Sequence, residues 1–151
     1  MAKYVSLYTD GSCAPNPGPG GWAAVAVYSN GCVEEFSGGV GRTTNNRMEM
    51  TAALEGLLRL EPNCVVKLHT DSQYLKFGIT WWIDRWRERN WLTTNGSGVK
   101  NKDLWLALLD AELRHAVVHW VWIKGHSGNC WQDRADELAE RGRCLSAMGG
   151  F

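Results

Sequence analysis

The sequence lacks a long apolar run and an excess of either charge. No apolar stretch approaches the ~20 residues that a membrane-spanning helix requires, so we expect no membrane partner. Residues 1–4 lead directly into a predicted strand, and we expect no signal peptide. Sixteen lysines and arginines balance sixteen aspartates and glutamates. Net charge therefore gives no indication of a nucleic-acid partner, and only the distribution of charge could do so.

Cysteines are few and scattered along the chain. There are five, an odd number, and none forms a C-x-x-C pair, so the sequence predicts neither a disulfide framework nor a zinc site. We therefore expect a reducing, cytoplasmic location. With 151 residues, of which 44% are hydrophobic, the chain suits one domain with a substantial core. We expect this single domain to span residues 1–151, with a frayed tail at 146–151.

Two apolar segments end in the same way. Residues 5–9 lead into Asp10 and residues 65–70 lead into Asp71, and in both cases a threonine precedes the aspartate and a small residue follows it. If the two segments are parallel neighbouring strands, their carboxylates meet at one edge of the sheet. Carboxylates held close together repel unless a positive charge lies between them. A divalent metal ion suits this position, because hard cations prefer oxygen ligands.

The rest of the pattern predicts an α/β fold with a mixed five-stranded sheet flanked by helices. The first three strands form an antiparallel meander that ends at Gly38-Gly39. A helix with Asn46 as its N-cap, and with Ala52 and Gly56 on its sheet-facing side, leads to the fourth strand. Parallel pairing of the first and fourth strands is therefore expected. The predicted strands are 3–9, 22–28, 33–37, 65–70 and 117–123, and the predicted helices are 45–60, a short one after residue 71, 80–89, 102–114 and one that begins near residue 131.

Four carboxylates lie at the ends or on the sheet-facing margins of these elements: Asp10, Glu49, Asp71 and Asp136. Taken singly, each has an ordinary explanation. The aspartates could cap a turn or a helix, or be stabilised by a helix dipole. Glu49 has the spacing of a capping box from Asn46. Taken together they are harder to dismiss. Two like charges about 4 Å apart cost about 4 kcal/mol at an effective dielectric near 20, which indicates a compensating cation.

Seven short motifs follow one another along nearly the whole chain. They are YTDGSC at 8–13, NPGPGG at 16–21, TTNNRME at 43–49, TDSQY at 70–74, VKNKDLW at 99–105, KGH at 124–126 and ADELA at 135–139. As a set they are highly specific, and with them the chain resembles a bacterial-type (type 1) ribonuclease H. The resemblance implies a ribonuclease H-like fold and an endonuclease that hydrolyses the RNA strand of RNA–DNA hybrids.

The resemblance also implies a mechanism. The four carboxylates would hold two Mg²⁺ ions, with Mn²⁺ as an alternative, at the scissile phosphate. Asp10 would bridge the two ions, Glu49 and Asp71 would complete one side, and Asp136 would serve the other ion. In-line attack would leave a 5′-phosphate and a 3′-hydroxyl. His126 would assist proton transfer or product release, whereas without the resemblance it is a histidine of a surface loop.

Substrate contacts are implied in the same way. The 2′-hydroxyl is what marks RNA at a given site, and amides and backbone groups can both donate to it and accept from it. The groups implied to test for it are Gly11, Ser12, Asn16, Asn45, Asn46 and Gln73. Arg42, Thr44 and Asn101 match a pocket for a phosphate of the DNA strand, and Trp82 matches an aromatic that packs on a deoxyribose. For Asn45 and Asn46 the alternative is helix capping. We expect the protein to act as a monomer.

Residues 84–102 match the protruding basic handle of the bacterial enzymes. Here five basic residues face two acidic ones, which is a thin excess for holding nucleic acid. Five of the nine tryptophans lie between residues 81 and 105, and we expect those of the handle to serve packing, because a duplex offers no free bases. We therefore expect weak, less salt-sensitive hybrid binding.

The segment 129–133 departs from the resemblance. Gln132 and Asp133 stand where the family commonly has Asn-Glu, and they are chemically close substitutes, whereas Cys130 and Trp131 have no explanation. Two other functions remain open. A relative of the same superfold, such as an integrase or junction resolvase, would act on DNA, and a hybrid-binding module would have an inactive site. The amides and Trp82 argue against the first, and the four acids against the second.

Overall fold

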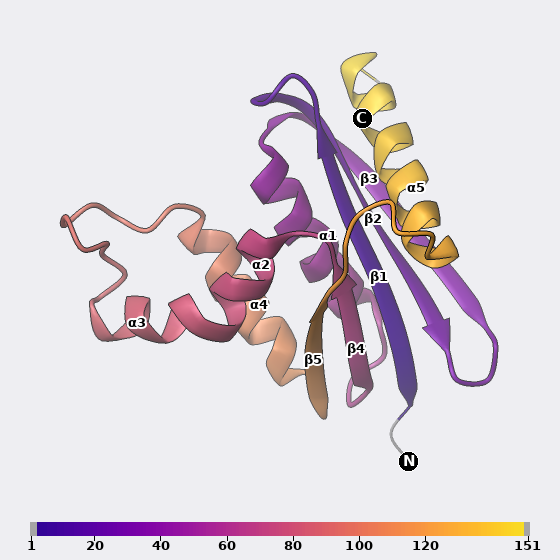
Figure 1. Cartoon of the computed structure of the whole chain (residues 1–151), viewed down its shortest axis with the longest axis horizontal. Helices are drawn as coiled ribbons and strands as arrows, with labels where there is room; N and C mark the ends of the chain where they lie inside the picture. The colour runs from indigo at the N-terminus through magenta and orange to yellow at the C-terminus, as the bar shows by residue number, and fades with distance from the viewer. Residues whose placement is uncertain (1–2, 150–151) are drawn as a thin grey trace.

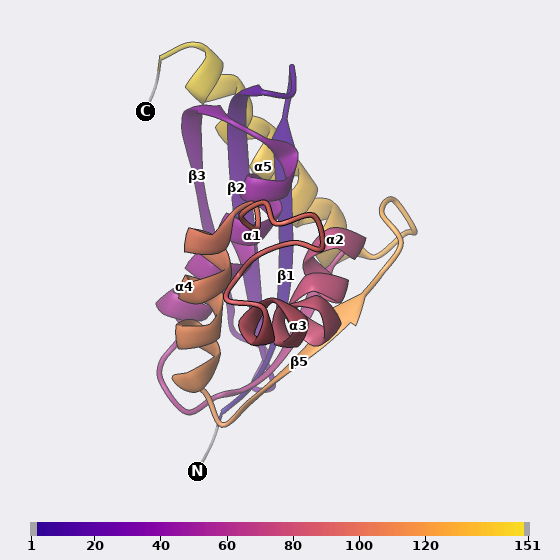
Figure 2. The ribbon, with the colours of Figure 1, turned by 90° about the vertical axis from the view of Figure 1, so that its left-hand side faces the viewer.

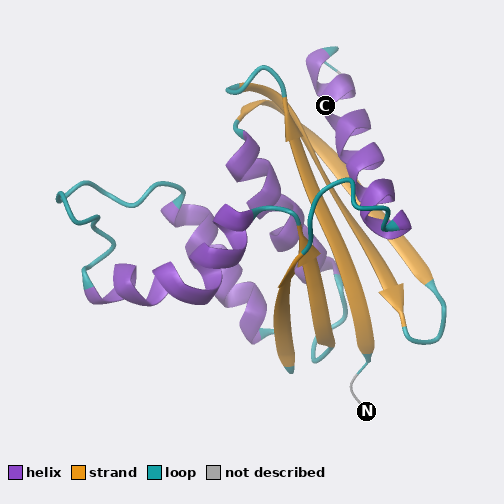
Figure 3. Ribbon diagram, viewed as in Figure 1, coloured by secondary structure: helices purple, strands orange, loops and turns teal. Residues whose placement is uncertain are grey.

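Strand β1 (Tyr4–Cys13) lies at the centre of a five-stranded sheet (Figure 1). The computed structural model describes residues 3–149. The sheet also contains β2 (Gly18–Tyr28), β3 (Val33–Thr43), β4 (Val65–Thr70) and β5 (Val117–Trp122), in the order β3-β2-β1-β4-β5. The β1–β2 and β2–β3 pairs are antiparallel, and the β1–β4 and β4–β5 pairs are parallel (Figure 3). The predicted mixed sheet, with β1 and β4 parallel, is thus confirmed.

The first three strands are longer than predicted, because glycines extend them instead of ending them. β3 continues through Gly38, Gly39 and Gly41 to Thr43, so the predicted end of the meander was wrong. A Cβ on Gly38 would lie 2.7 Å from Nε1 of Trp22, which stands opposite it on β2. The absence of a side chain here allows the Trp22 ring to lie against the strand.

Helices cover both faces of the sheet (Figure 2). Helices α1 (Asn45–Arg59) and α4 (Lys102–Leu113) lie over one face, where Leu7, Leu57 and Leu68 belong to the main core. Helix α5 (Cys130–Ala147) covers the other face, with Ala135 and Ala139 against the buried side chains of β2. Small residues bring α5 close to the strands, and a Cβ on Gly142 would lie 2.3 Å from the backbone oxygen of Gly38.

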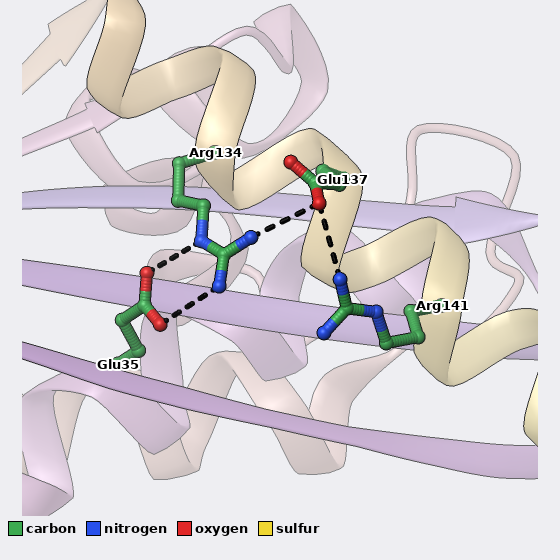
Figure 4. Close-up of polar contacts among 4 residues, drawn as sticks. All are labelled: Glu35, Arg134, Glu137 and Arg141. Carbon is green, nitrogen blue, oxygen red and sulfur yellow. Dashed lines mark hydrogen bonds and ion pairs between the residues drawn. The ribbon is translucent and has the colours of Figure 1, made fainter.

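Ion pairs also hold α5 to the sheet (Figure 4). Arg134 donates from Nε and Nη2 to the two carboxylate oxygens of Glu35 on β3, at 2.6 and 3.1 Å. Glu137 accepts from Arg134 and from Arg141, at 3.0 and 3.1 Å. These contacts lie at the surface, so the packing of small residues beneath them contributes more to the attachment of α5.

Helix α1 begins at Asn45, within the segment predicted to open it, but its N-cap lies two residues earlier than predicted. Its N-cap is Thr44, whose Oγ1 accepts from the Arg47 amide at 3.2 Å, so the assignment of Asn46 as N-cap was wrong. The extended backbone of Thr44 leaves its hydroxyl free to cap the helix, while Asn46 already lies in the first turn. The predicted sheet-facing side is confirmed, since Ala52 and Gly56 are buried.

The segment after β4 is helical throughout residues 73–88, in place of the separate helices predicted. It consists of α2 (Gln73–Phe77), the π-helical turn η1 (Gly78–Trp82) and α3 (Ile83–Glu88), and α3 extends away from the sheet (Figure 1). A Cβ on Gly78 would lie 2.2 Å from the Trp105 ring, so this wide turn packs directly on that buried indole. The Trp86 ring also packs there, 5.4 Å from the Trp105 ring.

At the C-terminus, α5 continues through Ser146 and Ala147, into the tail that was expected to be frayed. Ser146 is buried, so the two added residues are held in the helix. Residues 150 and 151 of that tail lie outside the described residues. Among residues 3–149, no helix is both long enough and apolar enough to cross a membrane.

Candidate active site

Asp10 and Asp71 meet where the parallel ladder between β1 and β4 ends. The last paired residues are Tyr8 and His69, so β1 continues beyond β4 and presents Asp10 beside the residue that follows β4. Carboxylate oxygens of Asp10, Glu49 and Asp71 all lie within 4.8 Å of one another. The sequence placed both aspartates at one sheet edge, and the structure brings Glu49 of α1 to the same point.

The close approach of α1 to β1 depends on Gly11. A Cβ at this position would lie 2.5 Å from the backbone nitrogen of Glu49 and 2.8 Å from the Met48 side chain. With no side chain at Gly11, the first turn of α1 touches the strand and Glu49 points into the site. Oε2 of Glu49 is buried and has no hydrogen-bond partner among the described residues.

Burial raises the pKa values of all three carboxyl groups, and the charge of a neighbouring carboxylate raises those of Asp10 and Glu49 further. Burial, followed by the charge of Asp71, raises the pKa of Asp10 to about 8. Burial and the charge of Asp10 raise the pKa of Glu49 well above its usual range, and burial raises the pKa of Asp71. Without a cation the cluster therefore holds protons that isolated carboxyl groups would have lost at neutral pH. A bound divalent cation would replace those protons.

Asp136 lies at the margin of this cluster. It is partly buried in the second turn of α5, and its interaction with Asp10 contributes to the raised pKa of that residue. It also raises the pKa of Asp71 through its charge. Asp136 thus approaches the site from the opposite face of the sheet to Glu49, but it is not one of the three residues within 4.8 Å.

Two groups beside Asp71 had no predicted role. The Trp122 indole donates to the backbone oxygen of Asp71 at 2.9 Å, and a Cβ on Gly125 would lie 2.9 Å from its Oδ2. The loop of His126 therefore passes directly over Asp71. His126 itself is exposed and has a φ of 57°, in the left-handed region. The absence of a side chain at Gly125 allows this close approach.

Gln132 was noted only as a substitute for a common family residue. It is 4% exposed, and its Nε2 donates to the backbone oxygen of Thr9 at 2.9 Å. The spacing of four residues between Gln132 and Asp136 was the available signal, because it places both on one side of a helix.

The residues expected to test for the 2′-hydroxyl lie on elements around the cluster. Oδ1 of Asn16 accepts from the backbone amide of Asn45 at 3.3 Å, which joins the Gly/Pro turn to the start of α1. Asn46 and Gln73 are exposed, in the first turns of α1 and α2. The hydroxyl of Ser12 is already engaged by two residues of α5, Glu140 and Arg143, both at 3.1 Å.

Asn101 is held from two sides. Its Oδ1 accepts from Arg47 at 3.2 Å and its Nδ2 donates to the Tyr74 hydroxyl at 3.0 Å, while Arg47 also forms two hydrogen bonds with Asp103. Thr44, also expected to bind a phosphate, caps α1 next to Arg47. The predictions omitted Arg47 and Tyr74 as supports of Asn101, because each lies far from Asn101 in the chain.

Arg42 and Trp82 complete the predicted substrate surface. Arg42 is exposed near the end of β3, two residues before Thr44. Trp82 is 37% exposed, and its ring stands edge-on to Tyr74 with centroids 6.1 Å apart. A groove lined by Asn46, Tyr74 and Asn101 continues toward the loop 93–100, with a volume of about 470 Å³.

Comparison with known proteins agrees with this geometry. The RNase H family model matches residues 2–144. A ribonuclease H of Aeromonas salmonicida is 53% identical over 92% of this chain and 89% of its own length, and one of Mesorhizobium japonicum is 48% identical over 100% and 84%. Among solved structures, LC9-RNase H1, a type 1 RNase H with the type 2 active-site motif, is similar with a TM-score of 0.86 and 29% identity, over 97% of this chain and 74% of the other. LC11-RNase H1 in complex with RNA/DNA hybrid shares the fold, with a TM-score of 0.71 and 23% identity over 94% and 98%.

Proposed function

The chain belongs to the ribonuclease H family and is an endoribonuclease, and we propose that it hydrolyses the RNA strand of RNA–DNA hybrids by in-line, two-metal-ion chemistry, leaving 5′-phosphate and 3′-hydroxyl ends. One observation carries the proposal: carboxylate oxygens from three different elements lie within 4.8 Å of one another. Burial is the largest cause that raises the pKa of each acid, and no lysine or arginine among residues 3–149 is a main cause of these shifts. Such a cluster is suited to hard divalent cations.

The residues present fit a divalent metal. All the donors are carboxylates, and Glu49 has a buried oxygen that lacks a partner within the described part of the chain. Asp10, Glu49 and Asp71 would hold the metal, with Asp136 completing the site from α5. When bound, two Mg²⁺ ions, or Mn²⁺ in their place, supply activation of water and stabilisation of the leaving oxygen.

The remaining residues bind and orient the hybrid. The backbone of Gly11 and the side chains of Ser12, Asn16, Asn45, Asn46 and Gln73 read the 2′-hydroxyls of the RNA strand. Arg42, Thr44 and Asn101 bind a phosphate of the DNA strand, with the Asn101 amide oriented by Arg47 and Tyr74. Trp82 packs on a deoxyribose, and His126 moves a proton at the edge of the site.

The whole chain acts as one catalytic domain in this proposal, as a monomer in a reducing cytoplasm. All five cysteines are free thiols, which supports that location. The relatives named ribonuclease H, 48% and 53% identical over most of the chain, support the choice of a hybrid over the duplex DNA that an integrase or resolvase would take.

Cleavage of end-labelled duplexes tests the proposal. We expect cleavage of the RNA strand of the hybrid with Mg²⁺, none with EDTA, and none of double-stranded RNA or DNA. Asp10→Asn should lower the rate by more than ~100-fold, since even loss of an outer-shell partner of a metal costs up to that factor. Asp110→Asn, an exposed aspartate of α4, is the matched control and should retain full activity. Cleavage of duplex DNA, or an active Asp10→Asn protein, would contradict the proposal.

A further inference from the structure

We propose that Gln132 is a positioning residue that sets the separation between Asp136 on α5 and Asp10 on β1, and so completes the metal site. The inference deepens the proposed function and rests on it. Gln132 belongs to the first turn of α5, whereas Asp10 belongs to a strand more than a hundred residues earlier. The contact between the two elements therefore depends on the tertiary structure and cannot arise from local sequence.

The geometry of the contact places it immediately behind the acids. Nε2 of Gln132 donates to the carbonyl oxygen of Thr9 at 2.9 Å, and Thr9 is bonded to Asp10. On α5, Gln132 precedes Asp136 by four residues, so both side chains lie on the same side of the helix. A shift of Gln132 relative to Thr9 would move Asp136 relative to Asp10 by a similar amount.

Both ends of this contact are fixed by other hydrogen bonds. Asn129 caps α5, and its Oδ1 accepts from the amides of Trp131 and Gln132, both at 3.0 Å. Thr9 is fully buried, and its Oγ1 donates to the carbonyl of His69 on β4 at 3.0 Å. A buried polar connection thus runs from α5 through β1 to β4, one or two residues from Asp10 and Asp71.

The carbonyl oxygen of the Gln132 amide is left without a partner in the part of the protein that the structure describes. Oε1 is buried and lacks a hydrogen-bond partner among residues 3–149. A buried acceptor without a partner costs about 1–3 kcal/mol, and native proteins rarely keep one. The amide holds the strand with one atom and remains open to a hydrogen-bond donor with the other.

The test replaces the amide with a side chain of similar length that cannot donate. Gln132→Met keeps the unbranched shape and removes the bond to Thr9. Ser146→Ala is the matched control, because Ser146 is another buried residue of α5 whose hydroxyl has no partner among the described residues, at the far end of the helix. Unfolding curves in EDTA establish that both variants are folded.

Mn²⁺ binding, measured by isothermal titration calorimetry, is the first readout. We expect Gln132→Met to bind Mn²⁺ about 10–100-fold more weakly, the range typical of outer-shell partners of a metal, and Ser146→Ala to bind it as the unchanged protein does. In cleavage assays the Mg²⁺ concentration for half-maximal rate should rise, and kcat should fall while KM for the hybrid is unchanged. Native Mn²⁺ affinity and an unchanged Mg²⁺ midpoint in folded Gln132→Met would overturn the inference.

A double-mutant cycle with Asp136→Asn separates positioning from a general loss of stability. If Gln132 acts through Asp136, its substitution should weaken Mn²⁺ binding much less in the Asp136→Asn background. Equal losses in both backgrounds would overturn the inference. The calorimetric measurement does not depend on the reaction. A protein whose Mn²⁺ affinity depends on Gln132 but which cleaves no hybrid would refute the proposed function alone.

Discussion

At the scale of single residues, burial and like charge act together on the acids. A carboxyl group whose pKa is raised by folding binds its proton more tightly in the native state than in the unfolded state. Between the two pKa values the native state therefore holds more protons, and the free energy of unfolding decreases as the pH rises. For Asp10 this interval extends from its ordinary value of 3.8 to about 8.

We therefore expect the metal-free protein to lose stability as the pH is raised from about 4 to about 8, the interval between the ordinary and the raised pKa of Asp10. Thermal unfolding in EDTA measures this, and each 1 kcal/mol corresponds to about 2–4 °C in Tm for a chain of this size. Asp10→Asn should flatten the dependence, because it removes the charge that burial opposes. Parallel pH profiles for the two proteins would contradict the assignment.

Gly125 controls the distance between the His126 loop and Asp71. In Gly125→Ala the new methyl group would lie 2.9 Å from Oδ2 of Asp71, so the loop or the carboxylate must shift. We expect kcat to fall about 10-fold, toward the lower end of what a misplaced catalytic group costs, with the fold retained. Gly98→Ala is the control, since a Cβ there meets nothing within 4 Å. An unchanged kcat in Gly125→Ala would show that the loop position does not matter.

At the scale of the elements, α5 depends on small residues for its approach to β2 and β3. In Gly142→Ala the Cβ would lie 2.3 Å from the carbonyl oxygen of Gly38, and backbone atoms cannot turn aside as a flexible side chain can. We expect a loss of about 1–3 kcal/mol in urea unfolding, as for other overpacked sites. The exposed Cys144→Ala on the same helix should change stability by less than about 0.5 kcal/mol. Equal effects would rule out close packing as the cause.

The elements also show what sequence patterns can and cannot reveal. The bounds of β4 were predicted correctly, since an apolar run and its Thr-Asp end are local signals. The lengths of β1, β2 and β3 were not predicted correctly. Glycines often end strands, but here they continue them, because other elements pack closely against them in the tertiary structure. Likewise Asp10 and Asp71 were placed together from strand endings. The roles of Gln132 and Arg47 depend on contacts across 123 and 54 positions, which have no local signature.

At the scale of the whole molecule, the handle at residues 84–102 is weakly basic, and some of its aromatic side chains pack against the core. Trp86 packs on Trp105, in line with the packing role expected of handle tryptophans, whereas Trp81 just before it is 63% exposed. Arg85, Arg87, Arg89, Lys100 and Lys102 are all exposed, and so are Asp84 and Glu88. The local field is therefore only modestly positive.

We expect hybrid affinity to depend weakly on salt. Measured with the Asp10→Asn protein, the slope of log K against log salt should be smaller in magnitude than ~4.5, the value that about five phosphate contacts would give. Glu88→Lys should strengthen binding at low salt and steepen the slope by up to about 1 per added contact. A steep slope in the Asp10→Asn protein without Glu88→Lys would contradict this expectation, because it would mean that many more phosphates are neutralised than the handle can reach.

The contact between Gln132 and Thr9 has a consequence during synthesis. It joins positions 123 residues apart, and α5 also brings the last carboxylate. A polypeptide still on the ribosome, growing at about 5–20 residues per second, can form the sheet edge with its first aspartates long before α5 emerges. The nascent chain is thus expected to be inert, and nuclease activity to start only once translation has released the last helix.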